Sequence, residues 1–138
     1  MMDKASTLIG RLLLGHIFLL SGISKIGGYA ATQGWMEAMG VPGMLLPGVI
    51  LLEIAGSAAL IIGWQARAAA VALAAFSIAA ALLFHNNLSD QMQMIMFMKN
   101  LAIAGGLLFV FVHGPGAWSV DERRTAKRLP AQDTTLGG

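Results

Sequence analysis

The chain has 138 residues, of which 57% are hydrophobic and 12% are charged, and its formal net charge is +2. Soluble domains carry about 25% charged residues, so this composition is typical of an integral membrane protein, and the length allows one small bundle. The sequence contains no cysteine, which excludes disulfides, thiolate–metal sites and cysteine-ligated iron–sulfur clusters within the chain.

Four apolar segments approach or reach the length of about 17–25 residues that a helix needs to cross the hydrocarbon core of a bilayer. We expect spans at about Thr7–Gly27, Leu46–Gly63, Ala68–Phe84 and Met92–His113. The sequence therefore predicts an all-α integral membrane protein, with four helices in an antiparallel bundle over residues 1–113.

The first span has some features of a secretory signal peptide, because a mildly basic start precedes an apolar stretch. Arg11, His16 and Lys25 interrupt that pattern, and three further spans follow. We therefore expect a first helix that is retained.

The connection Gly28–Leu45 is the longest of the three loops between spans. It contains Trp35, Met36 and a Val-Pro-Gly break at 41–43, a combination that predicts a short interfacial helix. The other two connections, Gly63–Arg67 and 85–91, are short enough to be turns.

Lysine and arginine are distributed unevenly between the two sides of the predicted bundle. Lys4, Arg11 and Arg67 share one side with the chain's last segment, whereas loops 28–45 and 85–91 contain no Lys or Arg. The positive-inside rule then predicts that both termini are cytoplasmic.

Four cations gather in the polar segment 114–138, which we expect to be a flexible, basic cytoplasmic tail. They are Arg123, Arg124, Lys127 and Arg128. Since these cations flank the last apolar span, the isoelectric point of about 9.4 indicates contact with the lipid surface and water rather than with nucleic acid.

Three spans carry an ionisable residue well inside: Lys25, Glu53 and Lys99. A charge at the bilayer centre costs from about 3 to over 10 kcal/mol, so such residues normally face the bundle interior and pair. Glu53 and Lys99 lie roughly 10 Å from the outer end of their helices, and the long side chain of Lys25 can bend toward them. Asn100 and His85 lie at a similar level. We expect one polar network of these five residues in the outer half of the bundle.

Glycines share helix faces with the ionisable residues; on the first span, Arg11, Gly15, Phe18, Gly22 and Lys25 recur at alternating steps of four and three. Small residues let membrane helices approach closely. The expected helix-packing positions are Gly15, Gly22, Gly56 and Gly106.

No haem or metal site is predicted. His16 lies near mid-membrane, His85 at the outer edge and His113 at the inner edge, so no two of them match in depth as axial ligands. The alternating methionines of residues 92–98 invite comparison with a soft Cu(I) site. Only pairs of them share a helix face, and no cysteine completes a set, so adaptable packing explains them better.

Three segments of the sequence resemble the DoxX family of bacterial membrane proteins. Residues 10–26 (GRLLLGHIFLLSGISKI) resemble the family's opening helix, Glu53 and Gly56 with the turn 63–67 resemble its second segment, and residues 97–108 (FMKNLAIAGGLL) resemble its last. The resemblance covers residues 8–112. It implies a four-helix protein of the bacterial inner membrane, in a family associated with respiratory and sulfur redox chemistry.

The resemblance implies a subunit or accessory protein of a membrane or soluble oxidoreductase. Two cations against one carboxylate would give the predicted network a spare positive charge, which suits the oxygens of a quinone head group. Two alternatives remain open: a small solute or proton transporter or channel with the same residues as a relay, and a structural anchor for a partner enzyme. No cofactor motif is present, so no intrinsic cofactor is expected. The sequence leaves open whether the chain is itself an enzyme and whether copies associate.

Overall fold

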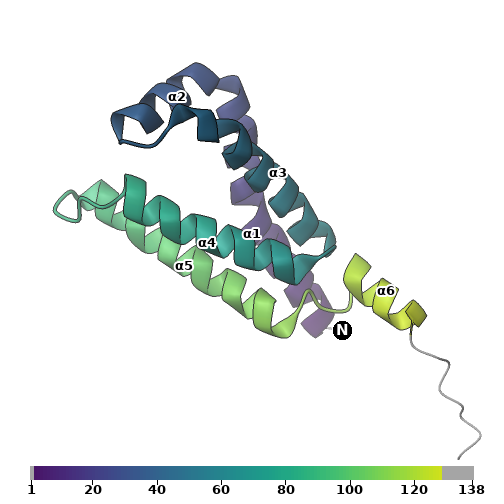
Figure 1. Cartoon of the computed structure of the whole chain (residues 1–138). Coiled ribbons are helices and arrows are strands. Elements are labelled where there is room, and N and C mark those ends of the chain that lie inside the picture. Colours follow the sequence, from purple (N-terminus) through teal and green to yellow (C-terminus); the bar gives the residue numbers. More distant parts are fainter. Residues whose placement is uncertain (1, 129–138) are drawn as a thin grey trace, which may run out of the picture.

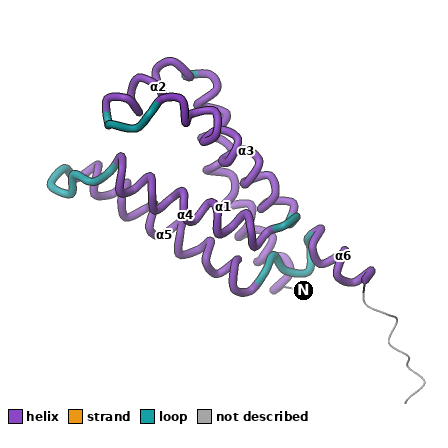
Figure 2. The backbone as a smooth tube through the Cα atoms, viewed as in Figure 1, coloured by secondary structure: helices purple, strands orange, loops and turns teal. Residues whose placement is uncertain are grey.

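A computed structural model describes residues 2–128, and within this range the chain is helical and contains no strand (Figures 1 and 2). The helices are α1 (Met2–Gly27), α2 (Tyr29–Ala38), a short 3₁₀ helix η1 (Gly43–Leu45), α3 (Leu46–Ile62), α4 (Ala66–Phe84), α5 (Gln91–His113) and α6 (Val120–Arg128). Four stretches are long and apolar enough to cross a membrane: Asp3–Gly27, Gly43–Ile62, Ala66–Phe84 and Gln91–His113. The predicted all-α, four-helix membrane fold is confirmed.

The four long helices form two antiparallel pairs. Helix α1 packs along α3, helix α4 packs along α5, and α3 contacts α4. Figure 1 shows the two pairs close together at the turn between α3 and α4 and diverging toward the opposite end, where α2 lies. We call these the narrow end and the wide end. Both the N-terminus and α6 lie at the narrow end.

Helix α4 joins the two pairs because it is rich in alanine. Its buried positions, spaced by three and four residues, form one face between α3 and α5. The small side chains there let the neighbouring backbones approach closely. The core includes larger residues from all four long helices: Phe18, Leu60, Leu73 and Leu107.

The contact between α1 and α3 depends on two of the expected packing glycines. A Cβ atom at Gly15 would lie 2.6 Å from Ile61 Cγ1, and a Cβ atom at Gly22 would lie 2.7 Å from Ile54 Cγ1. Both distances are too short for real carbon atoms. A larger residue at either position would therefore force the facing isoleucine side chain to shift or the two helices to move apart.

The other two expected packing glycines also lie at helix contacts, with slightly more room. A Cβ atom at Gly56 would lie 3.2 Å from Leu73 Cδ2 on α4, and a Cβ atom at Gly106 would lie 3.1 Å from Leu14 Cδ2 on α1. Gly106 thus marks a point where α5 touches α1.

Arg11 lies inside the narrow end, although its position in the sequence suggests a cytoplasmic flank. Its side chain is only 1% exposed. The guanidinium group donates hydrogen bonds to the carbonyl oxygens of Leu60 (3.3 Å) and Ile61 (3.0 Å), and also to that of Trp118. The bonds to Leu60 and Ile61 satisfy carbonyls at the C-terminal end of α3, where no intrahelical donor is left, and the bond to Trp118 ties this end to the segment before α6.

Part of the segment after α5, which the sequence predicts to be a flexible tail, forms the helix α6. Asp121 accepts hydrogen bonds from the backbone N–H groups of Gln65 (2.8 Å) and Ala66 (2.9 Å), and so caps the start of α4. This cap ties α6 to the turn between α3 and α4, so the first part of the expected tail contains a helix, and its flexibility stays a prediction. The part of the expected tail from 129 to 138 lies outside the described residues.

Candidate functional site

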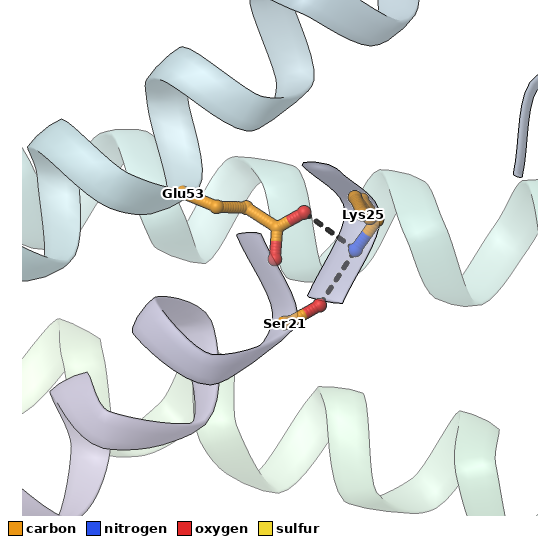
Figure 3. A network of polar contacts seen from close by, with 3 residues as sticks. All are labelled: Ser21, Lys25 and Glu53. Atoms are coloured by element: carbon orange, nitrogen blue, oxygen red, sulfur yellow. Dashed lines mark hydrogen bonds and ion pairs between the residues drawn. The ribbon is translucent and has the colours of Figure 1, made fainter. Parts of the chain in front are cut away.

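A buried ion pair joins α1 to α3 in the half of the molecule toward the wide end (Figure 3). Lys25 Nζ lies 2.7 Å from Glu53 Oε1 and donates a hydrogen bond of 2.6 Å to Ser21 Oγ. The side chain of Glu53 is 1% exposed and that of Lys25 is 23% exposed. Apart from this ion pair, Glu53 Oε1 has no polar partner among the described residues.

The packing of α1 on α3 positions this pair. A Cβ atom at Gly22 would lie 3.2 Å from the Cβ atom of Glu53, so the two backbones are close enough for the lysine to reach the carboxylate. Ser21 precedes Lys25 by one helical turn and shares its face. The serine hydroxyl therefore holds the ammonium group in place from its own helix.

A cavity of about 220 Å³ adjoins the ion pair, between the two helix pairs and beneath α2. Its polar lining residues are Ser21, Lys25, Thr32, Glu53, His85 and Asn100. Its aromatic lining residues are Phe18, Trp35, Phe76 and Phe84. The cavity is thus a mostly apolar space with polar groups directed at it from several helices, as in typical small-molecule sites.

Asn100 and His85 bring hydrogen-bonding groups to this cavity from α5 and from the end of α4. The side chain of Asn100 is half-buried and forms no hydrogen bond with any residue of the described range. His85 Nδ1 lies 3.2 Å from Gln93 Oε1. Because an amide oxygen accepts, this contact is a hydrogen bond when Nδ1 carries a proton, and Nε2 is then the ring nitrogen not engaged by Gln93.

Lys99 does not belong to this site, and the prediction of a Lys25–Glu53–Lys99 network is wrong in this residue. Lys99 is exposed, does not line the cavity, and has no carboxylate within ion-pairing distance among residues 2–128. The inward face of α5 instead carries Asn100 and, one turn further on, Ile103. One residue turns a helix by 100°, which places Lys99 on the neighbouring face. The site therefore has one cation and one carboxylate, and no spare positive charge.

Sequence reasoning missed the contribution of α2. Thr32, Trp35 and Met36 all line the cavity, and their spacing of three and four residues puts them on one face of that helix. The Trp35 ring stacks on that of Phe84, with centroids 4.6 Å apart and planes at 25°. The amphipathic spacing was visible in the sequence, but it gave no sign of which helices this face would meet.

The remaining histidines lie away from the cavity. His16 is exposed on α1, with Nδ1 2.5 Å from the carbonyl oxygen of Leu13, and His113 stacks on Phe109. Within residues 2–128, no three His, Asp or Glu side chains come together in a way that would hold a metal ion.

The sequence matches the family model described as DoxX over residues 6–86. The chain belongs to the DoxX family. The matched range contains Lys25, Glu53 and His85, whereas Asn100 and the segment 97–108 lie beyond it.

Two proteins of Escherichia coli K12 are similar along most of their length. Inner membrane protein YqjF is 46% identical over 120 residues, which cover 87% of this chain and 92% of that protein. Inner membrane protein YphA is 31% identical over 123 residues, which cover 84% of this chain and 88% of that protein. No solved structure matches the chain. The family, these relatives and the four apolar helices identify a multi-pass protein of the bacterial inner membrane.

Proposed function

We propose that this DoxX protein binds the ring head group of a quinone in the cavity beside Lys25 and Glu53, as a subunit or accessory protein of a membrane redox enzyme. The observation that carries the proposal is a buried, charge-neutral ion pair that opens onto an aromatic-lined cavity. Electrons would be exchanged with the partner enzyme, and this chain would supply the binding site.

The charge of the site favours a neutral ligand. A quinone ring is uncharged and carries carbonyl oxygens that accept hydrogen bonds. Lys25 donates one hydrogen bond to Ser21 Oγ and forms an ion pair with Glu53 Oε1, so its three ammonium protons include at least one donor for a ligand. The unpaired amide of Asn100 is a second donor, on the opposite helix pair. Donors from two sides suit a ring with an oxygen at each end.

The lining and size of the cavity favour a ligand that places only a flat ring inside and leaves any apolar tail outside. Aromatic side chains prefer offset-stacked or edge-to-face contacts with other rings, and four of them line the cavity. At about 220 Å³ the cavity is smaller than the roughly 300–1,000 Å³ of sites for drug-sized ligands. A single ring with small substituents would fill it.

The proposed orientation has both termini in the cytoplasm and the cavity in the outer half of the membrane. Lys4 belongs to the first turn of α1, Arg67 belongs to the first turn of α4, and further cations belong to α6. The start of α1, the turn before α4 and α6 all lie at the narrow end (Figure 1). The loops at the wide end, 28–45 and 85–91, contain no Lys or Arg. This asymmetry supports the orientation through the positive-inside rule.

Equilibrium binding of a short-tailed ubiquinone analogue to the protein in lipid nanodiscs tests the proposal. Asn100→Leu keeps the approximate side-chain shape and removes one neutral hydrogen bond worth about 0.5–1.5 kcal/mol, so affinity should fall about two- to tenfold. Lys99→Met is the matched control, because it removes the neighbouring charge outside the cavity. We expect it to leave the affinity unchanged.

A double variant, Lys25→Met with Glu53→Leu, separates binding from folding. Replacing both partners of a buried ion pair by apolar residues is often neutral for stability. The double variant should therefore fold and lose the analogue. Absence of binding to the wild type, or unaltered binding to the folded double variant, would refute the proposal and favour the scaffold or transporter alternatives.

A further inference from the structure

Helix α2 covers the wide end of the cavity and bridges the two helix pairs. It follows α1 after Gly28 and leads through η1 into α3, so by connectivity it belongs to the α1–α3 pair. Its cavity-facing side chain Trp35 nevertheless stacks on Phe84 at the end of α4. This stack bridges the two helix pairs at the wide end, where they diverge.

The turn after α2 is held against that helix. Val41 N–H donates a hydrogen bond of 2.9 Å to the carbonyl oxygen of Met36, and Gly43 packs so closely on Gln33 and Glu37 that a Cβ atom there would clash with both side chains. Met36 itself is only 4% exposed. The turn thus holds α2 in place, and Trp35, although 45% exposed, is the side chain that reaches from α2 to α4.

Helix α2 lies over the cavity on the side of the wide end, between the ion pair and the exterior. Glu53 is only 1% exposed, and this fraction already includes any surface that lipid would cover in a bilayer. With Thr32, Trp35 and Met36 above the cavity, a polar molecule arriving from the water at the wide end meets the inner face of α2 before it meets the carboxylate.

The contact between α1 and α5 is less extensive than the contacts within the α1–α3 and α4–α5 pairs. Helix α1 packs along α3 and α5 packs along α4, whereas α1 and α5 touch each other only sparsely. One of their contacts, Leu14 against Gly106, lies on the narrow-end side of the cavity. Above it, the cavity is lined by Ile17 on α1 and Ile103 on α5, and Ile17 is 44% exposed. In a bilayer, the exterior next to Ile17 is lipid.

We propose that the ligand reaches the cavity sideways from the bilayer, between α1 and α5, while α2 and the Trp35–Phe84 stack keep water out. The ligand class is then a membrane-dissolved amphiphile, whose ring enters the cavity and whose apolar tail stays between the helices and the lipid. This inference rests on the proposed function in taking the cavity as the ligand site. The access route itself can be measured without any ligand.

The absence of cysteine from the sequence makes single-cysteine labelling a direct test. Ala80→Cys places a thiol in the cavity, Ala79→Cys places one on the exposed side of the same helix, and Ser89→Cys places one in the exposed turn between α4 and α5. Each variant is held in nanodiscs, which leave both faces of the bilayer open to water. Each is then treated with a charged methanethiosulfonate and, separately, with a membrane-soluble maleimide.

We expect Ser89→Cys to react with both reagents. Ala79→Cys and Ala80→Cys should react mainly with the membrane-soluble reagent, and more slowly than Ser89→Cys does, because apolar surroundings disfavour the reactive thiolate. Because a charged group is excluded from an apolar site, the charged reagent should label Ala80→Cys at least about tenfold more slowly than Ser89→Cys. Adding Trp35→Ala should raise that slow rate about tenfold and leave the rate at Ala79→Cys unchanged. Ile17→Trp should slow the membrane-soluble reagent at Ala80→Cys alone.

Equal rates of the charged reagent at Ala80→Cys and Ser89→Cys, with Trp35 intact, would overturn the inference, because the cavity would be open to water. An unchanged rate after Trp35→Ala would overturn the role of α2, and an unchanged rate after Ile17→Trp would overturn the lateral route. The expected labelling pattern in a protein that fails to bind the quinone analogue would support the access route and refute only the proposed ligand.

Discussion

Removing one partner of the Lys25–Glu53 pair should destabilise the protein far more than removing both. The pair is 2.7 Å apart and its carboxylate is 1% exposed, so Glu53→Gln leaves the lysine charge without a counter-ion in an apolar surrounding. Breaking a buried pair in this way costs about 3–5 kcal/mol. For a chain of this length, that corresponds to a fall in melting temperature of about 10–20 °C.

The comparison uses four proteins in detergent, followed by circular dichroism during heating. They are the wild type and the variants Glu53→Gln, Lys25→Met/Glu53→Leu and Lys99→Met. The double variant should melt close to the wild type, because no buried charge remains unpaired. Lys99→Met should change stability by less than about 0.5 kcal/mol, since Lys99 is exposed and unpaired within the described residues. Equal melting temperatures for Glu53→Gln and Lys99→Met would refute the reasoning, because Glu53 would then be solvated.

Three further predictions concern packing, capping and orientation. Gly22→Ala places a carbon against α3 and should cost about 1–3 kcal/mol on thermal melting, whereas Gly10→Ala, with open space around it, should cost nothing. Asp121→Ala removes the cap of α4 and should cost about 1 kcal/mol in the same assay; no loss would mean that α6 is not held there. A phosphatase reporter inserted at Ser89 should be active in the periplasm and one fused after residue 138 inactive; the reverse pattern would contradict the proposed orientation.

The fold and half of the site follow from simple sequence rules. Four apolar stretches require four membrane-spanning helices, and the Gly15 and Gly22 face of α1 identifies the side on which α3 packs. Once those two helices are antiparallel neighbours, Lys25 and Glu53 come to the same depth and pair. Charge and helix length alone are sufficient for that part of the prediction.

The prediction for Lys99 failed because it depended on helix phase. An error of one residue rotates the assigned face of a helix by 100°. The prediction placed Lys99 on the same face as Gly106, and Gly106 is half-buried rather than central. The truly inward residue, Asn100, lies next to Lys99 in the sequence. Periodicity in an apolar helix cannot resolve such a difference, since both faces are equally hydrophobic.

The polar contacts at the narrow end could not be predicted, because their partners are far apart in the sequence. Arg11 binds carbonyl oxygens of Leu60 and Trp118, and Asp121 caps a helix that begins 55 residues earlier at Ala66. Each of these contacts joins a side chain to a backbone group far along the chain. Because nearly every residue has the same backbone groups, the sequence does not show which of them the side chain will bind. The sequence predicts Arg11 as a cytoplasmic flank and gives no sign that its side chain lies in the interior.

The most direct test of the central claim, that the cavity beside Lys25 and Glu53 holds a quinone ring, is photolabelling with a photoactivatable quinone analogue in nanodiscs, followed by peptide mapping. The account predicts label on α2 and the end of α4, around Trp35 and Phe84, and loss of that label when excess unlabelled analogue is added. Label confined to the exposed face of α5 around Lys99, or label that excess analogue does not displace, would contradict it.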